Sequence, residues 1–225
     1  LVISAGSALD LSWADAHVAA IIDSFYPGAR GGKAVAEAIF GDFSPSGKLP
    51  VTFYQGTENL PEFTDYDMSD RTYRYTDKNV LYPFGYGLHY GTIRYENAQI
   101  SCAQCSVRDA VDVSVDVINE SSYTIHESVQ AYIQHEEADA YEPGYQLKGI
   151  QTVTLQPKET KRVTISLKAR DFAIITQEGE CVVRPGSYRI AIGGQQPDAR
   201  SAKLTGSDVA ALVVRREGAQ TPVEY

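Results

Sequence analysis

The amino-acid sequence predicts an α/β segment followed by an all-β unit, and the all-β unit is expected to form a β-sandwich of the immunoglobulin type. Two patterns carry this prediction. In residues 1–91, apolar residues recur at helical spacing between two strand-like stretches, in the order strand, helix, helix, strand. In residues 92–225, apolar and polar residues alternate in short runs that are separated by turn signals, with no helical stretch between them.

The elements of the first segment follow from its apolar spacing. Residues 1–3 are expected to end a buried strand, and a chain that opens inside a strand is expected to be a piece of a longer polypeptide. A helix is predicted from about Trp13 to Ser24, with Ser12 as its cap. A second helix is predicted from about Gly32 to Phe40, ended by Gly41, and residues 49–54 are expected to form a strand. Apolar residues on one face of the first helix are Val18, Ile21, Ile22 and Phe25.

The second segment has the period of two that is typical of half-buried strands. Valine alternates with polar residues over 111–117, and similar runs occupy 129–133, 163–167 and 188–192. Turn-forming residues at 119–122, 156–159 and 184–187 separate these runs. The boundary is predicted near Gly91, so the expected domains are 1–91 and 92–225.

Composition excludes several classes of function. The chain has 225 residues, of which 43% are hydrophobic and 22% charged, as in ordinary globular domains. Its net charge of −9 disfavours general nucleic-acid binding, because an acidic surface repels phosphate backbones. No apolar run approaches the ~20 residues that a membrane helix needs, so no membrane span is expected.

The cysteines do not predict a metal centre or a disulfide framework. Cys102 and Cys105 form a CxxC, but neither His126 nor His135 follows at a spacing that is typical of zinc sites. A redox CxxC normally opens a helix, whereas this one lies between strand-like stretches. No metal and no cofactor are therefore predicted. The odd number of cysteines, with Cys181 standing alone, favours the cytoplasm.

Other signs of chemistry are incomplete. The glycine-rich stretch 27–34 lacks two positions of a phosphate-binding Walker loop, and no GxSxG nucleophile motif occurs. Three acids, Asp65, Asp67 and Asp70, cluster beside Arg71. Closeness in sequence does not place two carboxylates on either side of a glycosidic bond, so this cluster is interpreted as a cleft-rim or interdomain loop.

A run of separate motifs resembles glycoside hydrolase family 3, and it covers nearly the whole chain in order. The second half is similar to the fibronectin type III-like domain of that family. The motifs of the first half are GSALDLSWAD (6–15), YPGARGG (26–32), FGDFSPSGKLPVT (40–52), RTYRY (71–75) and YPFGYGL (82–88). Those of the second half are QLKG (146–149), LQPKET (155–160), VRPGSY (183–188) and IGG (192–194).

The resemblance implies a three-domain parent: a barrel-type N-terminal domain, an α/β sandwich, and a fibronectin-like domain. Such a protein would release sugars from the non-reducing ends of β-linked glucosides or xylosides by a retaining, two-step mechanism. The resemblance implies an Asp nucleophile in the barrel and a Glu acid/base upstream of Leu1. Neither motif occurs in this sequence, so no catalytic residue is assigned and the chain alone is expected to be inactive.

The resemblance also sharpens the expected fold and partners. The chain should be the closing part of an α/β sandwich domain, followed by a fibronectin type III-like β-sandwich. Its expected partners are the missing barrel and the rest of the sandwich domain, from the same protein or a companion chain, and a β-linked oligosaccharide or aryl glycoside as substrate. A homo-oligomer remains open.

Arg71, Tyr73 and Tyr75 are the candidate substrate-binding residues, placed at the rim of the cleft. Guanidinium donors and tyrosine faces suit sugar hydroxyls and rings, and interdomain packing is the alternative role. The alternative function is a non-catalytic carbohydrate-binding or structural β-sandwich module. That alternative predicts an exposed aromatic platform on the sandwich, yet Trp13, the single Trp, lies in the first half.

Overall fold

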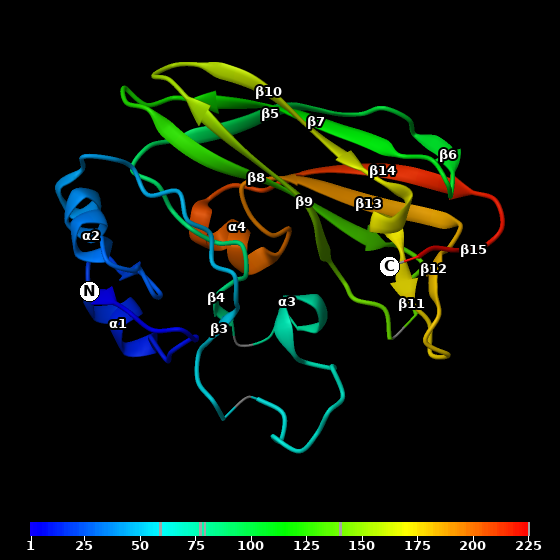
Figure 1. Cartoon of the computed structure of the whole chain (residues 1–225), viewed down its shortest axis with the longest axis horizontal. Helices are drawn as coiled ribbons and strands as arrows, with labels where there is room; N and C mark the ends of the chain where they lie inside the picture. The colour runs from blue at the N-terminus through cyan, green and yellow to red at the C-terminus, as the bar shows by residue number, and fades with distance from the viewer. Residues whose placement is uncertain (59, 77, 79, 140, 225) are drawn as a thin grey trace.

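The computed structural model describes residues 1–58, 60–76, 78, 80–139 and 141–224. A long β-sandwich occupies the top of Figure 1, and residues 1–91 lie against its lower left side. The predicted fold class, an α/β part followed by a β-sandwich, is confirmed.

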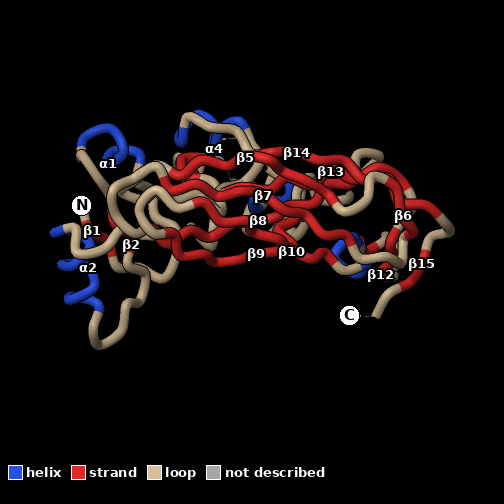
Figure 2. The backbone as a smooth tube through the Cα atoms, turned by 90° about the horizontal axis from the view of Figure 1, so that it is seen from above, coloured by secondary structure: helices blue, strands red, loops and turns tan. Residues whose placement is uncertain are grey.

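Two sheets form the sandwich, and Figure 2 shows their strands running along the length of the molecule. All neighbouring strands in them are antiparallel except the parallel pair β14 and β6. One sheet has the order β10 (Thr160–Leu167), β7 (Val111–Asn119), β5 (Ile93–Ile100). The other has the order β6 (Gln104–Ser106), β14 (Ala210–Glu217), β13 (Gly186–Gly193), β8 (Ile125–His135), β9 (Gln146–Leu155).

A third, small sheet closes one end of the sandwich. It joins β11 (Ile174–Ile175), β12 (Cys181–Val183) and β15 (Thr221–Pro222), and the 3-10 helix Ala169–Phe172 precedes it.

The predicted alternation describes the sandwich core accurately. All four valines of β7 that were expected on one face are fully buried, and the residues between them face outward or lie half-buried. Inward residues of β10 and β13 behave in the same way. The buried set from these three strands is Val111, Val113, Val115, Val117, Val163, Ile165, Leu167, Tyr188, Ile190 and Ile192.

Besides the 3-10 helix Ala169–Phe172, an α-helix interrupts the strands of the second half, so the prediction of an uninterrupted run of strands was wrong. Helix α4 spans Ala199–Thr205, between β13 and β14. Asp198 caps it, because its side chain accepts hydrogen bonds from the backbone N–H groups of Arg200 and Ser201. The segment is too short for a clear helical period, and the capping Asp is the signal that sequence reasoning missed.

The first predicted helix is much shorter than expected. Helix α1 spans Ser12–His17, and the following apolar residues form β2 (Ile22–Asp23), which pairs in parallel with β1 (Val2–Ile3). A short apolar run cannot be assigned to helix or buried strand by its period alone, which explains the error. Ser12 does not cap the helix; its hydroxyl donates instead to the carbonyl of Gln55.

The second helix and its end agree with the prediction. Helix α2 spans Gly31–Phe40, and Gly41 follows in the left-handed region at φ 80°. The strand expected over residues 49–54 is reduced to β3 (Phe53–Tyr54), which pairs with β4 (Val80–Tyr82). Leu49 still exchanges backbone hydrogen bonds with Gly85 and Tyr86. Among the described residues, no helix has the length and apolar character to cross a bilayer.

Candidate functional site

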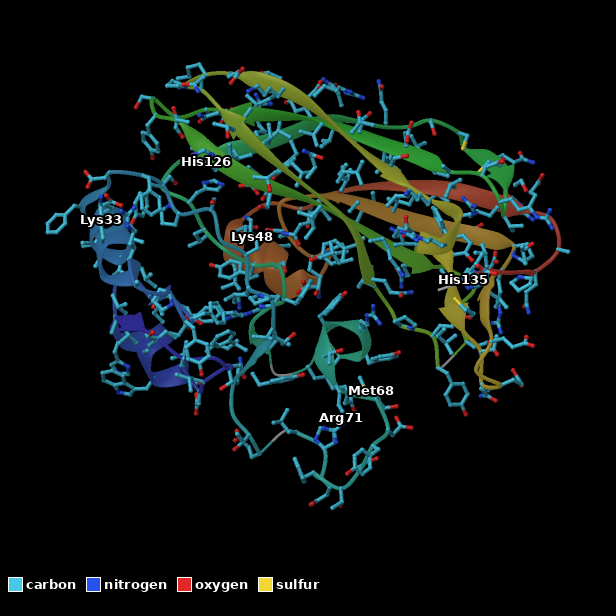
Figure 3. The ribbon with its side chains drawn as sticks, viewed as in Figure 1. Lys33, Lys48, Met68, Arg71, His126 and His135 are labelled. Atoms are coloured by element: carbon cyan, nitrogen blue, oxygen red, sulfur yellow. The ribbon has the colours of Figure 1, made fainter. Side chains whose placement is uncertain are left out.

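Arg71 holds together the loop that precedes α3 (Thr72–Tyr75). Its guanidinium donates from Nη2 to the carbonyls of Glu62 and Asp65, at 3.0 and 2.7 Å, and from Nε to the carbonyl of Asp67, at 3.1 Å. Arg71 and Met68 lie together in this loop, at the bottom of Figure 3. The guanidinium of Arg71, which was predicted to bind substrate at the rim of the cleft, therefore stabilises its own loop.

Tyr73 connects the same segment to the β-sandwich. Its ring stacks on Phe84, with 4.0 Å between ring centroids, and meets the edge of Tyr132 in β8. Its hydroxyl accepts a hydrogen bond from the backbone N–H of Leu147 at the start of β9. Tyr75, the third predicted residue, is partly exposed in the same helix. Sequence proximity thus places all three residues in one segment, while Arg71 and Tyr73 contact different neighbours.

The three acids beside Arg71 make local contacts. Asp65 accepts a hydrogen bond from the backbone of Asp67, and Asp67 accepts one from Ser69, which lowers the pKa of the Asp67 carboxyl. Asp70 forms an ion pair with Lys78 at 3.0 Å. The carboxylates of Asp65, Asp67 and Asp70 therefore bond within the loop or to Lys78, and the interpretation of the segment as a cleft-rim or interdomain loop stays a prediction.

A buried charge cluster at the junction of the two halves is the feature that sequence reasoning missed. Lys48 approaches the carboxylate of Glu127 to 3.1 Å, and His89 Nε2 approaches it to 3.4 Å. Only 1% of the Glu127 side chain is exposed. Figure 3 shows Lys48 between the first half and the sandwich. The available signal was a glutamate between Ile125 and Val129, in the inward series of β8.

Further groups complete this junction around a cavity of about 220 Å³. Lys48 also donates to the carbonyl of Gly87, at 3.0 Å. Burial and the neighbouring Glu127 raise the pKa of Tyr95 well above its usual value, so this phenol stays protonated. Gln130 donates to the carbonyls of Gly85 and Gly194. The two halves are therefore joined by buried polar groups in a fixed geometry.

Residues 1–91 expose many large apolar side chains. Phe40 and Tyr26 are each 83% exposed and Phe63 is 93% exposed, although such residues are normally removed from water. Buried residues of this segment form only a small cluster around Phe53 and Leu81. The large apolar side chains that this segment exposes, taken together as its exposed apolar face, are Leu1, Val2, Leu9, Trp13, Tyr26, Ile39, Phe40, Phe43, Val51, Leu60, Phe63, Tyr66, Met68, Leu88 and Tyr90, and they come from several separate elements and loops.

The histidines and cysteines occupy separate places. His17 stacks on Trp13, His126 contacts Thr154, and His135 lies 2.9 Å from the Glu142 carboxylate. Within the part of the chain that the structure describes, no three His, Cys, Asp or Glu side chains group together as a metal site would require.

Comparison with known proteins assigns both halves. Residues 1–90 match the model of the glycosyl hydrolase family 3 C-terminal domain, and residues 127–196 match that of the fibronectin type III-like domain. A beta-xylosidase of Formosa agariphila is 33% identical over 207 residues, covering 89% of this chain and 29% of that protein. The periplasmic beta-glucosidase of Salmonella typhimurium is 32% identical over 205 residues, covering 86% of this chain and 27% of that protein.

Solved structures agree with these relatives. A β-glucosidase from Erythrobacter marinus superimposes with a TM-score of 0.80 at 32% identity, over 96% of this chain and 28% of that one. A beta-glucosidase from Kluyveromyces marxianus superimposes with a TM-score of 0.83 at 25% identity, over 98% of this chain and 27% of that one. The chain thus spans less than a third of the length of these relatives. It belongs to glycosyl hydrolase family 3, of which it carries the C-terminal domain and the fibronectin type III-like domain.

Proposed function

We propose that the chain works as the C-terminal part of a retaining exo-β-glycosidase, which hydrolyses β-linked glucosides or xylosides at their non-reducing ends. Its own role is structural: it completes the α/β sandwich domain and supports the catalytic barrel. The nucleophile and the acid/base come from the region that precedes residue 1 in the relatives. The names of the relatives, beta-xylosidase and beta-glucosidase, support the proposed substrate class.

The many large apolar side chains that residues 1–91 expose are the observation that carries this proposal. Burial of apolar surface stabilises a fold by about 25 cal/mol per Å², so a face of this kind is expected to be covered. The β1–β2 pair also forms a two-stranded sheet by itself, and an isolated pair of strands is marginal in water. The missing strands and helices of the sandwich domain, together with the barrel, are the partner that we propose for this face.

An activity comparison tests the proposal. The 225-residue chain alone should not hydrolyse nitrophenyl β-glucoside or β-xyloside, whereas a polypeptide extended at its N-terminus by the matching region of a relative should. Co-expression of that region as a separate chain should restore turnover if the apolar face is the contact. Turnover by the repurified short chain alone would contradict the proposal and would place the nucleophile and acid within these residues.

Arg71, Tyr73 and Tyr75 are proposed to serve the rim of the cleft. Arg71 and Tyr73 would act by holding their loop in place, because their polar atoms already bond to the protein. Tyr75, which is partly exposed, is the residue of the three that we propose to contact substrate. In the extended enzyme, Tyr75→Phe should raise KM more than it lowers kcat, and an unchanged KM would contradict a contact with substrate.

The domain boundary is proposed at residues 91 and 92. The family model for the first half ends at residue 90, and β5 begins at Ile93, which supports this position. Purified 92–225 should then unfold as one cooperative unit, whereas 1–91 should not fold alone.

A second candidate function, a carbohydrate-binding module, has one observation in its favour. Tyr141 is 68% exposed beside a hollow of about 370 Å³ that is also lined by Asp139, Glu142 and Arg184. Aromatic faces beside planar polar groups suit sugar rings. This function would be favoured if gels that contain xylan or cellulose oligosaccharides slowed the migration of the wild-type chain. The variant Tyr141→Ala should then migrate without this delay.

A further inference from the structure

The CxxC pair lies where the chain crosses from one sheet of the sandwich to the other. Strand β5 ends at Ile100 in the three-stranded sheet, and β6 begins at Gln104 at the edge of the five-stranded sheet. Cys102 lies in the crossing and Cys105 lies in β6. Both side chains are partly exposed and pack against the sandwich core, so a small reagent can reach them.

Both ends of this crossing are anchored by backbone hydrogen bonds. Ser101 donates its N–H to the carbonyl of Asp112 in β7, at 2.9 Å, and Ala103 accepts from the N–H of Arg215 in β14, at 2.9 Å. Strand β6 pairs in parallel with β14, with Cys105 opposite Arg216. The short segment that carries both cysteines, three residues apart, is therefore fixed in place by both sheets.

The two thiols interact with each other and with a buried cation. Burial, followed by a hydrogen bond with Cys102, raises the pKa of Cys105 to about 11. Arg216, which is 1% exposed, directs Nη1 at the Cys105 sulfur at 3.8 Å. The same guanidinium donates to the carbonyls of Val107 and Asp109 and lies 4.1 Å from the centre of the Phe172 ring. The guanidinium of Arg216, itself held by two carbonyls, thus lies beside the Cys105 sulfur.

We propose that Cys102 and Cys105 form an intramolecular disulfide by exchange with a small-molecule disulfide, and that this bond fastens the crossing between the two sheets. The bond between the two Sγ atoms forms in two exchange steps through a mixed disulfide. The S–S bond of the reagent breaks, and its two sulfurs leave as thiols that carry the two protons and gain the two electrons. This inference is independent of the proposed glycosidase function.

The surroundings point to a structural disulfide rather than an easily reduced catalytic one. Catalytic CxxC pairs are strong oxidants when the thiolate of their reduced form is stabilised. Here burial outweighs the nearby charge of Arg216 and raises the pKa of Cys105, so the thiolate of the reduced form is disfavoured on balance. Exchange should accordingly be slow near neutral pH and faster in alkaline buffer.

The test is a redox titration of the full polypeptide with mixtures of reduced and oxidised glutathione. Samples are quenched with N-ethylmaleimide and analysed by intact-mass measurement and peptide mapping. The expected product is lighter by two hydrogen atoms, with a Cys102–Cys105 peptide, and exceeds the singly glutathionylated species by at least about tenfold at equilibrium. Glutathionylated or alkylated Cys102 and Cys105 as the main products would overturn the proposal.

Two variants separate this pair from the third thiol. Cys181→Ser keeps the pair and should leave the titration midpoint unchanged. Cys102→Ser should lose the intramolecular product and gain a glutathione on Cys105. Oxidation should also raise the melting temperature of the wild-type chain by a few degrees, with no rise in Cys102→Ser. A Cys181-containing disulfide, or loss of the product in Cys181→Ser, would equally overturn the proposal.

Discussion

Replacing Lys48 with methionine should destabilise the junction between the two halves more than any exposed substitution. The change keeps most of the apolar stem and removes the ammonium that lies 3.1 Å from Glu127. Only 13% of the Lys48 side chain and 1% of the Glu127 side chain are exposed, so water cannot take over the lost contact. Removing one partner of a buried ion pair costs about 3–5 kcal/mol when the other charge is left uncompensated, and the loss here is expected toward the lower end because His89 still lies 3.4 Å from Glu127.

That cost is large against a total stability of roughly 5–15 kcal/mol for a domain. At an effective dielectric constant of ~20, two unit charges at this separation attract by about 5 kcal/mol, which is consistent with the same range. Glu127→Gln removes the charge that Lys48 compensates. The double variant Lys48→Met/Glu127→Gln should therefore lose less stability than the sum of the single variants, with a coupling energy of about 1–3 kcal/mol.

Urea unfolding of the four proteins measures this cycle, and the chain offers separate probes for its halves. Trp13, the single tryptophan, reports on residues 1–91 by fluorescence, and far-ultraviolet circular dichroism reports mainly on the strands of the sandwich. In Lys48→Met the fluorescence transition should come at lower urea than the circular dichroism transition. Lys33→Met, an exposed lysine on α2, is the matched control. Additivity of the single variants within about 0.5 kcal/mol would refute the reasoning.

Three further predictions concern other parts of the chain. Gly85→Ala should lower the free energy of unfolding by about 2–4 kcal/mol, because φ is +75° and the added Cβ would meet the Tyr132 hydroxyl. Urea unfolding measures this, and a free energy within about 1 kcal/mol of wild type would contradict it. Hydrogen bonds from Asn97 and then Arg162 lower the pKa of Asp116, so their contribution to folding stability is complete above about pH 4 and is lost as the pH falls further. In Asp116→Asn, the free energy of unfolding should therefore depend less on pH below about pH 4. Arg71→Lys cannot reproduce the three carbonyl contacts and should speed tryptic cleavage of the loop, whereas equal cleavage rates would contradict that role.

The sequence predicted the secondary structure of the second half more accurately than that of the first half. The valines of β7 were correctly placed inward because alternate residues of a strand point to opposite faces, and burial follows directly. Helix α2 was predictable from its apolar spacing and from Gly41 at its end. Residues 18–24 were assigned wrongly to a helix, because the backbone N–H groups of Ile22 and Ser24 donate to the distant carbonyls of Leu1 and Ile3.

The candidate site divides in the same way. The sequence placed Arg71, Tyr73 and the acids in one segment. The partner of Arg71, the carbonyl of Glu62, and the partner of Tyr73, the N–H of Leu147, depend on how the chain folds back. Glu127 looked like an ordinary strand residue, since its partner Lys48 lies 79 positions earlier in the chain. The position of Cys105 beside the buried Arg216 was likewise visible only with β6 paired to β14.

The sequence by itself determined the family, the alternating core of the sandwich and the order of the two units, because these depend on local motifs and on residues close together in the chain. Tertiary structure alone decided the short helix α1, the buried ion pair of Lys48 and Glu127, and the apolar face that residues 1–91 leave exposed. The physical reason is that burial and charge pairing depend on which distant segments meet. Local spacing sets which face of a strand is apolar, and only the assembled sheets set what that face contacts.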